Sequence, residues 1–65
     1  MIIVTKIRKS GTHRWAHLIS DSLAELEREA NRLRVIIKKD IRGYHCDLTE
    51  HQRQLAIRHG AREEE

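Results

Sequence analysis

At residues 15–21 the chain reads Trp-Ala-His-Leu-Ile-Ser-Asp, and at residues 45–49 it reads His-Cys-Asp-Leu-Thr. Within each stretch apolar and polar side chains alternate, which is the period of a β-strand that buries one face. Each stretch runs into a residue that can cap a helix. The two stretches therefore predict two strands that each lead into a helix, and such strand ends commonly carry a binding site in α/β proteins.

Four segments are expected to be strands because they are short and either β-branched or alternating. They are residues 2–7, 13–19, 35–37 and 44–48. A polar turn at residues 8–12, with Gly11 as its pivot, is expected to join the first two strands into an antiparallel hairpin. A charged connection at residues 38–43 is expected to join the last two.

Two helices are expected, one after the second strand and one after the fourth. Ser22 with Glu25, and Thr49 with Gln52, have the spacing of a capping box, in which two side chains satisfy two free backbone amides. The second helix is expected to reach about His59 and to stop at Gly60. The apolar residues of the first helix recur at helical spacing: Leu23, Leu26, Ala30 and Leu33. Its charged residues are expected on the solvent face: Glu25, Glu27, Arg28, Glu29 and Arg32.

The element order β-β-α-β-β-α predicts an α+β fold, a small two-layer domain with the helices on one face of a short sheet. Residues 1–62 are expected to form this single domain, and residues 63–65 an acidic, frayed tail. A chain of 65 residues without Phe has a thin core, and its single cysteine, Cys46, allows no intrachain disulfide. Association is the expected further source of stability, so we expect a homo-oligomer.

The chain is expected to be cytoplasmic, or to act in the host cytoplasm if it is encoded by a phage. The apolar start at residues 1–4 is too short for a signal peptide, no transmembrane stretch is present, and the unpaired Cys46 suits a reducing compartment. The net charge of +3 is concentrated before Asp21, where the chain has no acidic residue. This distribution favours a small anion as partner over duplex DNA, and no membrane partner is expected.

Strand periodicity predicts which side chains face away from the helices. Cys46 and Leu48, like Ala16 and Leu18, are expected to pack under the helices. The opposite face then gathers an aromatic ring, two imidazoles and a carboxylate: Trp15, His17, His45 and Asp47. A ligand, a partner subunit or both are expected to cover this face.

Each of these side chains has a structural alternative to a role in binding. Trp15 is either a stacking platform for a base or a plug in an oligomer interface. His17 and His45 either bind phosphate oxygens and act as acid and base, or are bonded within the fold. Asp47 either orients His45 or braces the turn. Arg53 either turns inward as a phosphate clamp or is an exposed helix arginine.

A metal site remains a less favoured alternative. It would use residues whose types suit a metal but which come from separate elements: His17, Asp21, His45 and Asp47. We therefore expect no metal and no cofactor. The expected ligand-binding residues are Trp15, His17, His45, Asp47 and Arg53.

The two opening stretches, with the helices after them, resemble family 4031 of the domains of unknown function, which occurs in small bacterial and phage proteins. The family pattern W-x-H-L-x-A-D-[ST], followed by E-L and A-x-x-L, is matched from Trp15 to Leu33. The pattern H-Y-D-L-T, followed by R, A-I and G-A, is matched from His45 to Ala61. The matching positions of the two parts are Trp15, His17, Leu18, Asp21, Ser22, Glu25, Leu26, Ala30 and Leu33, then His45, Asp47, Leu48, Thr49, Arg53, Ala56, Ile57, Gly60 and Ala61.

The chain departs from that pattern at several positions. Thr5 and Lys6 stand where acidic residues are common in the family, Glu27 replaces a histidine, and Cys46 replaces a tyrosine. The resemblance implies a fold and a site but no activity.

Three functions follow as hypotheses. The first is a small homo-oligomeric protein that binds an anionic, plausibly nucleotide-like molecule; the occurrence of the family in phages suggests sequestration of a host signal. The second is a phosphodiester hydrolase that uses His17, His45 and Asp47. The third is a module that binds a protein or a nucleic acid, although the helices are separated by strands and form no helix-turn-helix.

Overall fold

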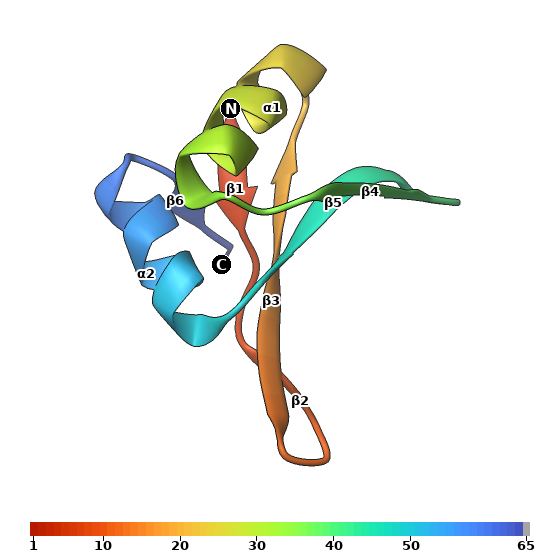
Figure 1. Cartoon of the computed structure of the whole chain (residues 1–65), viewed down its shortest axis with the longest axis vertical. Helices are drawn as coiled ribbons and strands as arrows, with labels where there is room; N and C mark the ends of the chain where they lie inside the picture. The colour runs from red at the N-terminus through yellow and green to blue at the C-terminus, as the bar shows by residue number, and fades with distance from the viewer. Residues whose placement is uncertain (65) are drawn as a thin grey trace.

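The computed structural model describes residues 1–64 and shows a small α+β fold, as the sequence predicted (Figure 1). Its elements are β1 (Ile2–Val4), β2 (Arg8–Ser10), β3 (His13–Ser20), α1 (Leu23–Leu33), β4 (Ile37–Asp40), β5 (Gly43–Leu48), α2 (Glu50–Arg58) and β6 (Arg62–Glu63). The strand order is β4-β5-β3-β1-β6, and β2 pairs with β3 outside this path. The long β3 runs through the centre of the sheet, and its hairpin with β2 extends away from the helices (Figure 1).

The predicted first strand is shorter than expected, and a further strand follows it. β1 ends at Val4, and β2 forms from Arg8–Ser10, inside the segment expected to be a turn. The cause is Thr5, whose backbone N–H donates to the His17 carbonyl while its hydroxyl accepts from the His17 N–H at 2.8 Å. Because a side chain takes over a bond of the strand ladder, the main chain leaves the regular pairing before it rejoins β3 as β2.

The predicted third strand is displaced toward the C-terminus. The structure has β4 at Ile37–Asp40, where the sequence indicated a charged connection. Residues 34 and 35 instead end α1: Arg34 has a left-handed φ of 58°, and Val35 N–H donates to the Ala30 carbonyl. β4 is an edge strand, where charged side chains are common, so its composition did not resemble that of a buried strand.

The start of the acidic tail is ordered, contrary to the expectation of fraying. Glu63 belongs to β6, which runs parallel to β1 in register with Ile3 and Val4. Glu64 N–H then donates to the Val4 carbonyl at 2.8 Å. Glu65, also assigned to the tail, lies outside the described residues.

The core lies between the sheet and α1 and α2, and it is aliphatic as expected. Ala16, Leu18, Cys46 and Leu48 are all buried, which confirms the predicted face of β3 and β5. In the part of the chain that the structure describes, no helix has the length and apolar character needed to cross a membrane.

Glu29 contradicts the predicted helix surface. It is buried with a carboxylate oxygen 2.7 Å from Nδ1 of His59, which follows α2. The pair joins α1 to the end of α2. Its charge had placed Glu29 on the solvent face, but burial of a carboxylate is tolerated where a hydrogen-bonding partner faces it.

The two helix starts differ. Thr49 and Gln52 form the complete capping box that their spacing predicted. Ser22 caps α1 through Glu25 N–H, but the Glu25 carboxylate turns to Ser20 and the N-terminal ammonium instead of completing the box. The first capping box is therefore only half formed.

Candidate functional site

The sheet register brings the predicted polar face together. His17 of β3 is directly opposite Asp47 of β5, and His45 of β5 is directly opposite Lys38 of β4. Because paired residues on neighbouring strands project to the same face, these side chains gather on the face that the helices leave uncovered. Trp15, two residues before His17 on β3, belongs to the same row.

Three aromatic rings follow one another across this face. The ring centroids of Trp15 and His17 are 4.7 Å apart, and those of His17 and His45 are 4.6 Å apart. The rings are tilted to each other at 46° and 55°, within the range that aromatic pairs favour. The contacts hold the two imidazoles in fixed positions relative to the indole.

Asp47 connects the histidines to a lysine. Its Oδ1 lies 3.1 Å from His17 Nε2 and 3.6 Å from His45 Nε2. Its Oδ2 accepts a hydrogen bond from Lys38 Nζ at 2.8 Å. This bond lowers the pKa of the Asp47 carboxyl below its usual value and raises the pKa of the Lys38 ammonium. Asp47 is therefore ionised at neutral pH, with one oxygen facing the imidazoles.

His17 is held from both its backbone and its ring. The main-chain N–H of His17 donates to the Thr5 hydroxyl on the β1 side, and the His17 side chain is 25% exposed. Burial lowers the pKa of His17, the charge of nearby His45 lowers it further, and Asp47 opposes the shift. The imidazole is therefore neutral at pH 7, so that one ring nitrogen has a free lone pair.

His45 is the more deeply covered of the two histidines. Its side chain is 14% exposed, and its Nδ1 lies 3.7 Å from Asp40 Oδ2. Asp40 is itself fixed, since its Oδ1 accepts a hydrogen bond from the Arg42 N–H at 2.7 Å. His45 therefore has a carboxylate near each ring nitrogen, Asp40 on one side and Asp47 on the other.

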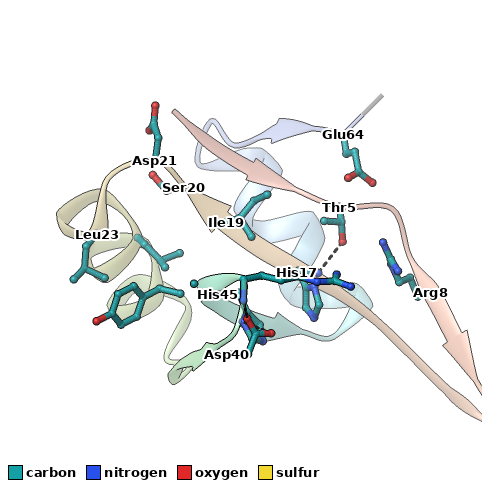
Figure 2. A pocket seen from close by; sticks show the side chains of 14 residues that line it. Thr5, Arg8, His17, Ile19, Ser20, Asp21, Leu23, Asp40, His45 and Glu64 are labelled. Carbon is teal, nitrogen blue, oxygen red and sulfur yellow. Dashed lines mark hydrogen bonds and ion pairs between the residues drawn. The ribbon is translucent and has the colours of Figure 1, made fainter.

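Two hollows flank the histidine pair. The first encloses about 610 Å³, and Arg8, Arg42 and Tyr44 line it together with His17 and His45. Figure 2 shows His17 and His45 near the middle of this hollow, with Thr5 and Arg8 next to His17 and Asp40 beside His45. The second encloses about 540 Å³ on the Trp15 side, and the same two histidines line it. A molecule bound in either hollow would contact the imidazoles.

Two residues with expected roles lie elsewhere. Arg53 is engaged by contacts within the fold: its Nε donates to the Thr5 carbonyl at 2.8 Å, and its guanidinium pairs with Glu63 at 3.2 Å. It ties α2 to the chain after β1, and its 12% exposure leaves it little access to a ligand. Asp21 pairs with the N-terminal ammonium and also lines the first hollow, but it is not part of the histidine–aspartate group.

Several site residues were missing from the sequence analysis. Lys38, Asp40 and Arg42 fell within the expected connection, and Arg8 within the expected turn. The alternation of Ile37, Lys38 and Lys39 was too short to reveal a strand. Pairing residues 37–40 back onto 43–46 as a hairpin would have placed Lys38 beside His45.

The ligand types for a metal also meet here. One nitrogen of His17, one nitrogen of His45 and one oxygen of Asp47 all lie within 4.8 Å of one another. The two imidazoles can also donate to an anion or exchange protons with it.

Comparison with known proteins gives a family and nothing closer. Neither the curated proteins nor the solved structures include a match to the chain. One family model matches residues 3–65, nearly the whole length, and its description is "Protein of unknown function (DUF4031)". The match agrees with the resemblance carried by the two strand ends and their helices. The chain belongs to this family.

Proposed function

We propose that the protein is a small homo-oligomeric binding protein for an anionic, nucleotide-like small molecule, held against His17 and His45. The observation that carries the proposal is the pair of guanidinium groups in the first hollow. Arg8 and Arg42 line it together with both histidines, and neither forms an ion pair with another described residue. Guanidinium groups without a protein partner suit planar, two-point binding of phosphate or carboxylate.

Three acidic residues line the same hollow, and a cation neutralises one of them. Asp21 pairs with the N-terminal ammonium at 2.6 Å, and Asp40 accepts from the Arg42 N–H. Glu64 accepts from the Lys6 N–H at 3.4 Å. Asp40 and Glu64 keep their negative charge, and the two guanidinium groups and the imidazoles are the hydrogen-bond donors that the hollow offers to an anion.

The aromatic residues favour a ligand that carries a ring. Trp15 lies against His17 and lines the second hollow, while Tyr44 lines the first. Stacking of a base on such a side chain contributes about 1–3 kcal/mol and tolerates different bases. A nucleotide combines this ring with the negative charge that the arginines suit. Binding without turnover would suffice to sequester a host signal if the chain is encoded by a phage.

Exposed apolar residues support the homo-oligomer. Ile36 and Ile41 are largely or wholly exposed on either side of β4, and Tyr44 is half exposed on β5. They surround an edge strand with free main-chain groups, a surface that a second copy can cover. The test is sedimentation at micromolar concentration, where a dimer or larger assembly supports the proposal and a stable monomer contradicts it.

The binding proposal can be tested through Trp15, the single tryptophan of the chain. Its fluorescence is recorded while adenosine 5′-monophosphate or inorganic pyrophosphate is added to chelator-treated protein. We expect saturable quenching, and at least about tenfold weaker binding for Arg8→Ala or Arg42→Ala, because a charged hydrogen bond contributes about 1.5–3 kcal/mol.

The matched control is Arg58→Ala, an exposed arginine at the end of α2 and outside both hollows. It is expected to bind like the unchanged protein. Equal affinity of all three arginine variants would contradict the assignment of the hollow, and absence of any saturable response to both probes would contradict the proposed function.

Phosphodiester hydrolysis is the second candidate. It is favoured by the contact of both imidazoles with one carboxylate oxygen of Asp47, an arrangement that can orient an acid and a base. Incubation with bis(4-nitrophenyl) phosphate separates the two candidates. Release of nitrophenolate that stops in His17→Ala would favour the hydrolase, whereas unchanged substrate supports binding without turnover.

A further inference from the structure

We propose that His17, His45 and Asp47 form a binding site for one divalent transition-metal ion of the Zn²⁺ class. The inference goes beyond the proposed anion binding and does not require it. The ligand atoms are Nε2 of His17, Nε2 of His45 and Oδ1 of Asp47. Of the residues that the structure describes, these form the group with metal-ligand spacing.

Two of the three separations between the ligand atoms fit a single ion, and the third, between a nitrogen of each imidazole, is within 4.8 Å. Zn²⁺ binds imidazole nitrogen and carboxylate oxygen at about 2.0–2.2 Å, so two ligand atoms at a tetrahedral angle lie about 3.3–3.5 Å apart. The two nitrogen–oxygen separations are 3.1 and 3.6 Å, on either side of this range. The strand pairing that sets His17 opposite Asp47 fixes the backbone beneath them. An ion would therefore need only small side-chain shifts.

Two of the three ligands have, on the side away from the proposed ion, a neighbour of the kind found around metal sites. Lys38 bonds Oδ2 of Asp47, which leaves Oδ1 toward the histidines. Asp40 lies 3.7 Å from Nδ1 of His45, on the ring nitrogen opposite the proposed ligand atom. Metal-bound histidines commonly donate their second N–H to a carboxylate, which fixes the tautomer and the ring.

The ligand set selects the class of metal. Two imidazoles and one carboxylate suit Zn²⁺, Co²⁺ or Ni²⁺, whereas Mg²⁺ and Ca²⁺ prefer oxygen ligands throughout. Three protein ligands leave at least one position open. Since both histidines line the two hollows, that position faces the space where a small molecule can enter.

Calorimetry with Zn²⁺ on chelator-treated protein, in a buffer free of phosphate and nucleotide, tests the proposal. One Zn²⁺ per chain is expected to bind, and Co²⁺ is expected to give visible d–d absorption that Zn²⁺ removes. Asp47→Asn, an isosteric change at an exposed carboxylate, should abolish the Co²⁺ spectrum while circular dichroism stays that of the folded protein. Asp40→Asn should weaken binding about 10–100-fold, as expected for a residue that positions a ligand.

The control addresses unspecific binding, since the chain has five histidines. His51 is an exposed histidine of α2, and His51→Ala should leave the stoichiometry, the affinity and the Co²⁺ spectrum unchanged. Loss of binding in His51→Ala, or full binding by Asp47→Asn, would overturn the site, as would no Zn²⁺ binding by the unchanged protein. Because this assay contains neither phosphate nor nucleotide, a failure to bind Zn²⁺ would count against the metal site and not against anion binding.

Discussion

Leu26→Ala is expected to remove a large share of the stability of this domain. Leu26 lies on the inner face of α1, is 1% exposed, and belongs to the core cluster. Truncating such a leucine costs about 2–5 kcal/mol, because apolar contacts are lost and a cavity remains. A chain of 65 residues has a total stability of only about 3–10 kcal/mol. At about 4–8 °C per kcal/mol, the melting temperature should fall by about 8–40 °C.

Glu27→Ala is the matched control, one residue further along the same helix and exposed. Its expected change is within about 0.5 kcal/mol, because an exposed side chain is removed and alanine favours the helix. Both variants are melted by circular dichroism at one protein concentration, since association makes the melting temperature concentration-dependent. Equal shifts for the two variants would refute the assignment of the buried face of α1.

Three further predictions concern single contacts. Thr49→Ala should lower the free energy of unfolding by about 1 kcal/mol in urea titrations through loss of the α2 cap, with anion binding retained; unchanged stability would contradict the cap. Glu29→Gln should destabilise by about 1–3 kcal/mol, far more than Glu27→Gln, because it weakens the buried contact with His59; equal effects in urea would show that the contact is immaterial. Burial raises the pKa of the Cys46 thiol from 9.0 to about 11, so the folded protein holds this proton where the unfolded chain loses it. The contribution of the protonated thiol to the free energy of unfolding is therefore complete below pH 9 and is lost as the pH rises through 11. In thermal melts from pH 8 to 11, Cys46→Ala should remove this loss of stability.

The alternation in β3 and β5 was sufficient to predict the composition of the site face. Because successive side chains of a strand point to opposite faces, Leu18 and Cys46 point inward and His17 and Asp47 point outward, whatever the register of the strands. The register itself was not predictable from the sequence. It depends on the hairpin with Lys38 and on Thr5, whose hydroxyl replaces a main-chain bond. Contacts of this kind are made by single polar side chains and leave no periodic pattern.

The contacts of Arg53 were unpredictable for a similar reason. Its position on the helix after β5 is compatible with a phosphate clamp, but the chain end forms β6 and supplies Glu63 as its partner. Arg8 and Arg42, the cations of the first hollow that form no ion pair with a described residue, instead come from segments that looked like loops. A charged residue on a short edge strand and one in a turn have the same sequence signature, so only the tertiary structure separates them.

Native mass spectrometry of the protein, purified without added ligand, tests most directly whether the His17–His45 face is a ligand site in an assembly. We expect an assembly of at least two chains that carries additional mass from a small anion. The Arg8→Ala, Arg42→Ala double variant should remain folded and lose that mass. A single chain whose mass is that of the sequence alone, with the same result for the double variant, would contradict a ligand site in an assembly.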